Sequence, residues 1–198
     1  MAAMTAGPLQ RPEEESFLSK NQTLRGLFDE LLTRNFEESL RLSDREIISY
    51  MADLLTEFSR VEQVYAIRDA SGKSLEDVGE MLLASNPLFE AASFDREREV
   101  RKHIGDYTLF FAGLFPEAVN RWRLRRQRLD SLIDYVRTGK ESYFIVSEFN
   151  LFEYKDSAPL FKKMSDQFEY CVFGLNLVKR NLERMQQESY VRAQKLLF

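Results

Sequence analysis

The chain has 198 residues, a formal net charge of −4, and 44% hydrophobic and 30% charged residues, while glycine (8) and proline (5) are scarce. It is too apolar and aromatic for a disordered protein, and too poor in turn-forming residues for a collagen-like or turn-dense all-β protein. One cysteine excludes a disulfide framework, and one histidine excludes a three-histidine metal site.

The N-terminal residues 1–16 contain no apolar run and include three consecutive glutamates, which predicts a disordered leader rather than a signal or transit peptide. We expect residues 17–198 to form a single helical domain, since this length is typical of one domain. No segment reaches the roughly 18 continuous apolar residues of a membrane helix. Together with the single cysteine, these features favour a cytoplasmic protein without a membrane partner.

Helical periodicity dominates the first half of the chain. Thr23 is expected to cap a short helix, and Ser43 and Glu46 have the spacing of a capping box at the start of a long one. After the long helix, a further, shorter helix is expected to begin at Ser74. The stripe of the long helix consists of Ile47, Met51, Leu54, Phe58, Val61 and Tyr65.

The same periodicity continues after residue 90. A strong helix is predicted from about Ser93 to Ala112, and a short one from Pro116 to about Arg123, because proline suits a first helical turn. The next helix is expected to be broken or closely packed at Gly139. Residues 143–149 have the β-branched and aromatic content of a strand, but no partner strand is evident, so we expect helix there.

The last predicted helix begins near Ser157 and runs without a break through three heptads. Its apolar stripe is wide, which favours burial inside one domain over a two-stranded coiled coil. We therefore predict an all-α, single-domain helical bundle of about six helices. The heptad stripe consists of Met164, Phe168, Cys171, Leu175, Val178, Leu182 and Met185.

Glu99, His103 and Asp106 are the residues that look most like a site for chemistry. Their spacing places them near one face of the predicted helix, with Tyr107 adjacent. A carboxylate can orient an imidazole for general base catalysis, and the three together could hold a metal ion. The alternative is a structural histidine at the edge of the core. Since no second histidine completes the usual metal site of a bundle, we assign no catalytic residue, metal or cofactor.

A run of arginines from residue 121 to 128 carries five arginines in eight residues. Arginine pairs with phosphate and an aromatic ring can stack on bases, so a nucleic-acid contact is chemically reasonable, although the net acidity of the chain counts against it. The alternatives are that these arginines bind an acidic protein partner, or that they belong to a structural connection between helices. The candidate residues are Arg121, Trp122, Arg123, Arg125, Arg126 and Arg128.

The charge is divided unevenly between the two halves of the chain. Residues 1–100 carry a net charge of −9 and residues 101–198 a net charge of +5. This division indicates either self-association or two faces of one bundle.

Two further features concern the apolar residues. Cys171 lies in the heptad stripe, where burial would suppress its thiolate, so we expect it in the core. Most aromatic residues are expected there too, but Phe149, Phe152 and Tyr154 are close enough in the sequence to form an exposed edge that anchors a partner.

The segment 103–117, His-Ile-Gly-Asp-Tyr-Thr-Leu-Phe-Phe-Ala-Gly-Leu-Phe-Pro-Glu, resembles a family of bacterial helical proteins that share a His-Ile-Gly-Asp…Gly-Leu-Phe-Pro-Glu stretch. In that family a tyrosine-containing helix follows, similar to residues 134–143 here. The likeness spans about a fifth of the chain. It implies a bacterial, soluble, all-α protein and implies no activity or functional residue.

The leading hypothesis is a non-enzymatic helical protein that binds another protein, as an adaptor or as a homodimer. One alternative is a helical bundle that binds a small ligand or a metal, including an enzyme, centred on His103 and Asp106. Another is a nucleic-acid accessory protein that uses Arg121 to Arg128.

Overall fold

The regular structure in the described part of the chain is helical, apart from one isolated bridge between Arg68 and Ser74. The structure, a computed structural model, describes residues 23–86, 91, 93–125 and 132–185, with residues 120, 122–125 and 132–134 described by their backbone alone. The predicted leader lies outside these residues. The elements are α1 (Leu24–Asn35), η1 (Phe36–Leu40), α2 (Arg45–Phe58), α3 (Val61–Val64), α4 (Val78–Ala84), α5 (Phe94–Leu114), α6 (Pro116–Arg125), α7 (Leu132–Glu148), η2 (Phe152–Tyr154), α8 (Ala158–Asp166) and α9 (Phe168–Arg184).

The all-α prediction is confirmed, but the expected number of about six helices is not, because nine α-helices lie within the described residues. Two predicted long helices are divided. The first is interrupted after α2, and the last is interrupted at Gln167, so the prediction of unbroken heptads is wrong. The break allows α8 to pack mainly on α7 while α9 packs on α5 and α1. Met164 and Phe168, on either side of the break, are both fully buried.

Side-chain caps define where several helices begin. Thr23 accepts a hydrogen bond of 3.1 Å from the amide of Gly26, as predicted. The predicted capping box at Ser43 is wrong: Asp44 caps α2 by accepting hydrogen bonds from the amides of Glu46 and Ile47. An aspartate caps at least as well as a serine, and its charge also favours a helix N-terminus.

The start of α4 differs from the prediction for the same reason. Asp77 accepts hydrogen bonds from the amides of Gly79 and Glu80, whereas Ser74, the predicted start, pairs with Arg68 in the isolated bridge. The short helix therefore begins at Val78.

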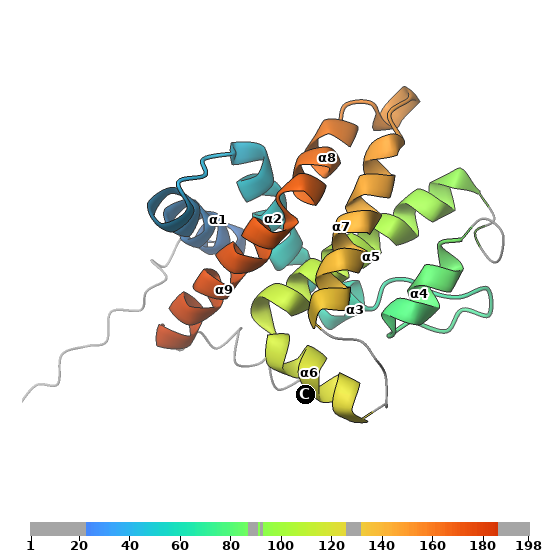
Figure 1. Cartoon of the computed structure of the whole chain (residues 1–198), viewed down its shortest axis with the longest axis horizontal. Coiled ribbons are helices and arrows are strands. Elements are labelled where there is room, and N and C mark those ends of the chain that lie inside the picture. Colours follow the sequence, from blue (N-terminus) through green and yellow to red (C-terminus); the bar gives the residue numbers. More distant parts are fainter. Residues whose placement is uncertain (1–22, 87–90, 92, 126–131, 186–198) are drawn as a thin grey trace, which may run out of the picture.

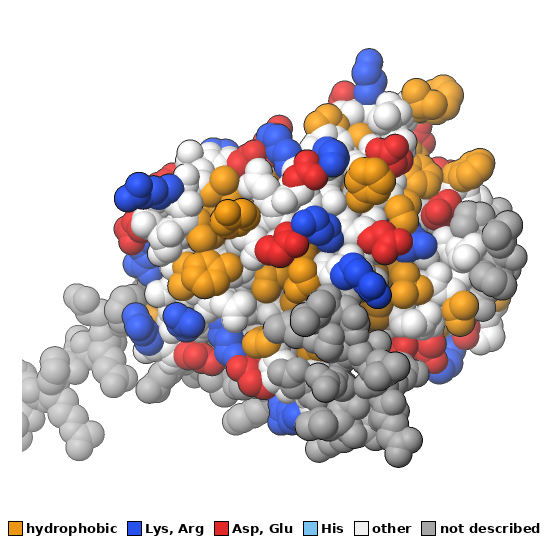
Figure 2. Space-filling view, viewed as in Figure 1, with side chains coloured by type: hydrophobic (Ala, Val, Ile, Leu, Met, Phe, Trp, Pro, Cys, Tyr) orange, Lys and Arg blue, Asp and Glu red, His pale blue; other side chains and the backbone are white. Residues whose placement is uncertain are grey.

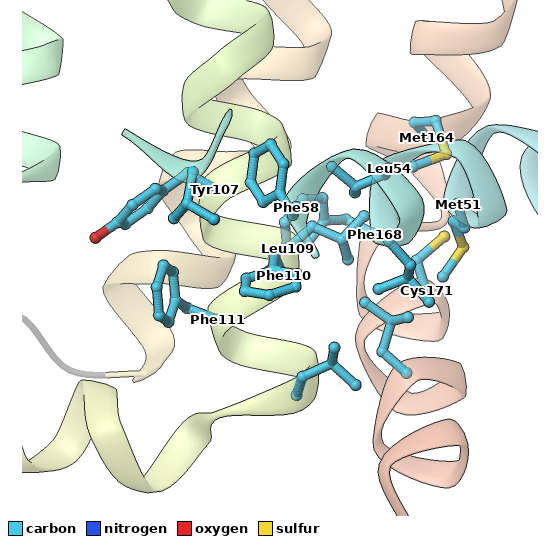
Figure 3. Packing of buried hydrophobic residues seen from close by; sticks show 14 of the residues in the cluster. Met51, Leu54, Phe58, Tyr107, Leu109, Phe110, Phe111, Met164, Phe168 and Cys171 are labelled. Carbon is cyan, nitrogen blue, oxygen red and sulfur yellow. The ribbon is translucent and has the colours of Figure 1, made fainter. Parts of the chain in front are cut away.

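Helix α5 forms the centre of the fold. All its residues from His103 to Leu114 are buried, and a helix buried on all sides must be covered by its neighbours. Figure 1 shows α7 crossing over α5, with α9 beside them and α4 and α6 packed at the periphery. In Figure 3, Phe58 of α2 lies near Phe110 of α5, while Met51 of α2 lies toward Met164 of α8 and Cys171 of α9. Cys171 is fully buried there, which confirms its prediction as a core residue.

Residues 143–148, whose composition also suited a strand, lie in α7, which ends at Glu148. The prediction of helix is confirmed for these residues. Gly139 does not break α7. A side chain at Gly139 would collide with the ring of Phe168 and the hydroxyl of Thr108, so the glycine serves close packing. Helix α6 begins at Pro116 as predicted. None of the described helices combines the length and apolar composition needed to cross a bilayer.

Candidate functional site

The residues predicted as one polar group on α5 contact different parts of the fold. Asp106 binds side chains of α2 and α7, whereas His103 binds a backbone carbonyl of α3. Glu99 is exposed and pairs with Arg96 on its own helix. The structure therefore does not bring the three together as one ligand set.

Asp106 is the centre of a buried hydrogen-bonded cluster. It is 3% exposed. Its Oδ1 accepts hydrogen bonds from the hydroxyls of Tyr50, at 2.5 Å, and Tyr143, at 2.7 Å. Its Oδ2 accepts a bond of 2.7 Å from the half-buried Lys102, one turn earlier on α5. Phe161 of α8 packs against both tyrosine rings. We call Asp106, Tyr50, Tyr143 and Lys102 the Asp106 cluster.

A glycine allows Tyr143 to reach the carboxylate. The position that a Cβ on Gly105 would occupy is 2.5 Å from two ring carbons of Tyr143. The ring therefore lies directly against the backbone of α5, one residue before Asp106. Because α5 and α7 meet without a side chain between them here, the hydroxyl of one helix can satisfy the carboxylate of the other.

The electrostatics of the cluster keep its tyrosines protonated. Burial, reinforced by the charge of Asp106, raises the pKa of Tyr50 and of Tyr143 well above the ordinary value. Burial alone would lower the pKa of Lys102, but the adjacent Asp106 carboxylate outweighs it and raises the pKa. The tyrosines are thus hydrogen-bond donors, and the arrangement is that of a satisfied structural network.

His103 and Tyr107 are tied to the backbone of neighbouring segments. The imidazole Nε2 donates a hydrogen bond of 3.1 Å to the carbonyl of Val64, and the ring packs against Phe58. The hydroxyl of Tyr107 donates to the carbonyl of Glu76 at 3.1 Å. Burial lowers the pKa of His103, which favours the neutral ring. These contacts match the structural alternative for the histidine. Within the described residues, no group of three or more His, Cys, Asp or Glu side chains is placed to hold a metal ion.

The tyrosines of the Asp106 cluster were not among the predicted site residues. Tyr50 and Tyr143 lie 56 and 37 residues from Asp106 along the chain, so no local spacing links them. The Gly-Asp pair at 105–106 was the available signal, since a glycine inside a helix can mark a close approach by another element.

The predicted arginine patch lies on and after α6. Arg121 is exposed on that helix. The side chains of Trp122, Arg123 and Arg125, and residues 126–131, which include Arg126 and Arg128, lie outside the described part of the structure.

A second feature is a group of exposed apolar side chains where the α7–α8 connection meets the start of α5. Phe94, Leu151 and Phe152 are 75%, 66% and 88% exposed. We call these three residues the aromatic tip. Of the predicted aromatic edge, Phe152 is exposed, whereas Phe149 and Tyr154 are partly buried. Phe94 and Leu151 were not predicted. The apolar residues of this helix at helical spacing are Val100, Ile104, Tyr107, Phe111 and Leu114. Phe94 lies outside that stripe, which was the signal for its exposure.

Polar contacts hold the two segments of the aromatic tip together. The hydroxyl of Tyr154 donates a hydrogen bond of 2.9 Å to Asp95. The Arg98 guanidinium lies 3.9 Å from the centre of the Tyr154 ring and donates a hydrogen bond of 2.9 Å to Ser157. The start of α5 is thus fastened to the connection that carries Phe152.

The backbone of Phe152 has a positive φ of 52°. A bulky side chain in this left-handed region costs about 1–2 kcal/mol, which glycine would avoid. Packing of the Phe152 side chain offsets little of this cost, because the side chain is almost fully exposed. Strain of this kind is typical of functional positions.

Other exposed aromatic residues are more dispersed. Phe144 of α7 and Tyr170 and Phe173 of α9 are also exposed, and the ion pairs Lys140–Glu169 and Lys162–Asp166 lie on α7, α8 and α9 as well. On the face that Figure 2 shows, hydrophobic side chains alternate with acidic and basic ones. Such single exposed residues are ordinary for a protein surface.

The chain matches no protein-family model, no curated protein and no solved structure. The resemblance of residues 103–117 to bacterial helical proteins stays an expectation. The contacts and surface chemistry of the chain itself therefore carry the functional argument.

Proposed function

We propose that the chain is a non-enzymatic helical interaction protein that docks a protein partner through the aromatic tip. The observation that carries this proposal is Phe152, a phenylalanine that is 88% exposed on a backbone with φ of 52°. Folding gains little from this residue in this conformation. Docking of the ring into a partner would explain why both its exposure and its strain are kept.

The energy available from such docking is substantial. Burying one exposed phenylalanine contributes about 1.5–3 kcal/mol, and the tip offers two of them beside a leucine. Large aromatic side chains surrounded by polar groups are the usual anchors of protein interfaces. Here Asp95 and Glu153 are the immediate chain neighbours of Phe94 and Phe152 and supply that polar surrounding.

The Asp106 cluster gives less support to a ligand-binding or catalytic function. Both oxygens of Asp106 already accept hydrogen bonds from Tyr50, Tyr143 and Lys102. A ligand would have to break these buried bonds, and each donor or acceptor left without a partner costs about 1–3 kcal/mol. A structural function for the cluster requires no such cost.

Site-specific photo-crosslinking tests the proposal. A benzophenone amino acid replaces Phe152 in the full chain, and the matched control carries it at Tyr170, an exposed aromatic position on α9. We expect a defined protein adduct from position 152, no equivalent adduct from position 170, and loss of the adduct when Phe94→Ser is added. An adduct pattern identical at both positions, or no adduct at 152, would contradict the proposal.

A further inference from the structure

We infer, on the basis of the proposed docking function of the aromatic tip, that its partner is a folded protein with a basic docking surface, in which lysine or arginine side chains border an apolar pocket. The shape of the tip and the charges around it point to this partner.

The aromatic tip is a projection rather than a groove. Phe94, Leu151 and Phe152 are 75%, 66% and 88% exposed, so they stand out from the surface instead of lining a hollow. In Figure 1 the α7–α8 connection lies at the upper end of the view, beyond the ends of both helices. A projecting ring is covered only when the partner surrounds it, and the anchor side chains of protein interfaces fill pockets of this kind. The partner surface is therefore concave and apolar at its centre, which a short extended peptide does not provide.

Acidic side chains accompany the apolar residues of the tip. Residues 94–99 contain three acidic and two basic side chains, and residues 148–156 contain three acidic and one basic, so the two segments carry −1 and −2. Glu148, Glu153 and Asp156 are all exposed, and none of them forms an ion pair with a lysine or arginine of the described residues. Their charge is therefore free to attract a partner.

The basic side chains at the start of α5 are already engaged within the fold. Arg96 pairs with Glu99 at 2.9 Å, and the guanidinium of Arg98 lies over the ring of Tyr154. Lys155 is the remaining basic residue of the two segments, and it is exposed. The charge that the tip region presents to a partner is therefore negative.

This negative charge disfavours three other occupants. In a symmetric tip-to-tip dimer, two surfaces of like sign would meet at the two-fold axis and repel each other. An anionic membrane surface and the phosphates of a nucleic acid would repel the tip in the same way. Basic groups around a pocket would instead pair with the carboxylates while the pocket covers the rings, and a guanidinium can also stack on an aromatic ring.

Charge reversal combined with photo-crosslinking tests the inference. The full chain carries a benzophenone amino acid at position 152, and the charge-reversed tip variant adds Glu153→Lys and Asp156→Lys. The matched control adds Glu37→Lys and Glu38→Lys, which change the net charge equally at two exposed positions of η1. In cells that naturally express the chain, we expect an adduct with one protein, whose crosslinked residue lies in an apolar pocket bordered by lysine or arginine. The adduct is expected to be lost in the charge-reversed tip variant and kept in the control.

Titration calorimetry with the purified partner then measures the dissociation constant at low and high salt. We expect the charge-reversed tip variant, without benzophenone, to bind about tenfold more weakly than the unmodified chain at low salt, since two attractive pairs become repulsive. The control is expected to stay within about twofold. High salt is expected to weaken the unmodified chain and to reduce the difference. Circular dichroism checks that both variants are folded.

Three outcomes would reject the basic partner and leave the docking function in place. They are an adduct with a pocket whose rim is acidic or uncharged, an adduct between two copies of this chain, and a charge-reversed tip variant that binds as tightly as the control. Two outcomes would reject both: the absence of any adduct from position 152, and binding to phosphatidylserine vesicles that is lost in Phe152→Ser.

Discussion

The hydroxyl of Tyr143 donates a hydrogen bond of 2.7 Å to the carboxylate of Asp106, and this bond joins the two helices at the centre of the fold. Both side chains are buried, so the bond is protected from water. It forms because Gly105 lets the Tyr143 ring lie against α5. The bond therefore sets the position of α7 along α5.

Removal of the Asp106 carboxylate is expected to destabilise the protein strongly. Asp106→Ala leaves two buried tyrosine hydroxyls and Lys102 without their acceptor, at a cost of about 3–5 kcal/mol. Tyr143→Phe removes one hydrogen bond and is expected to cost about 1–2 kcal/mol. Urea unfolding followed by circular dichroism measures both.

The matched control for this prediction is Lys162→Met, which removes an exposed lysine that also pairs one turn away on its helix. It is expected to change the free energy of unfolding by less than about 0.5 kcal/mol. Equal effects of Asp106→Ala and Lys162→Met would show that the cluster contributes little to stability.

His103 is expected to make the protein less stable in mild acid. Burial lowers its pKa from the ordinary value of 6.5, opposed by the charges of Asp106 and Glu99 and by the hydrogen bond to Val64, while the nearby Lys102 lowers it further. Below pH 6.5 the unfolded chain therefore binds a proton that the folded chain excludes. Stability falls by up to about 1.4 kcal/mol per pH unit until the folded pKa is reached.

Unfolding free energies at pH 7.5 and 5.5, compared between the unmodified chain and His103→Gln, measure this effect. The variant is expected to show a smaller loss over that interval, because a glutamine does not titrate. A larger loss in His103→Gln than in the unmodified chain would contradict the assigned direction.

Cys171 is expected to resist thiol reagents in the folded protein. Burial raises the pKa of its thiol to about 12, so almost no thiolate is present near neutral pH. We expect slow labelling by Ellman's reagent in buffer and complete labelling in denaturant. Rapid stoichiometric labelling of the folded chain would show that the thiol is accessible.

The sequence predicted the core better than it predicted the site. Stripes at helical spacing identified buried residues such as Ile47, Met51 and Phe168, because a core imposes the same spacing wherever the chain is helical. The break at Gln167 was missed, since no glycine or proline marks it.

The partners of Asp106 were missed for a different reason. Tyr50 and Tyr143 reach it from other helices, and contacts between distant elements leave no spacing in the sequence. The exposed Phe152 was identified from its aromatic neighbourhood, but its positive φ depends on the geometry of the α7–α8 connection.

The most direct test of the central claim, that Phe152 serves binding rather than folding, compares Phe152→Gly with Phe152→Ala in stability and crosslinking from position 94. We predict that Phe152→Gly raises the free energy of unfolding by about 1 kcal/mol relative to Phe152→Ala, because glycine removes the strain at φ of 52°. Both variants are predicted to lose the adduct formed by a benzophenone at position 94. A Phe152→Gly variant that is less stable than Phe152→Ala and keeps the adduct would contradict the account.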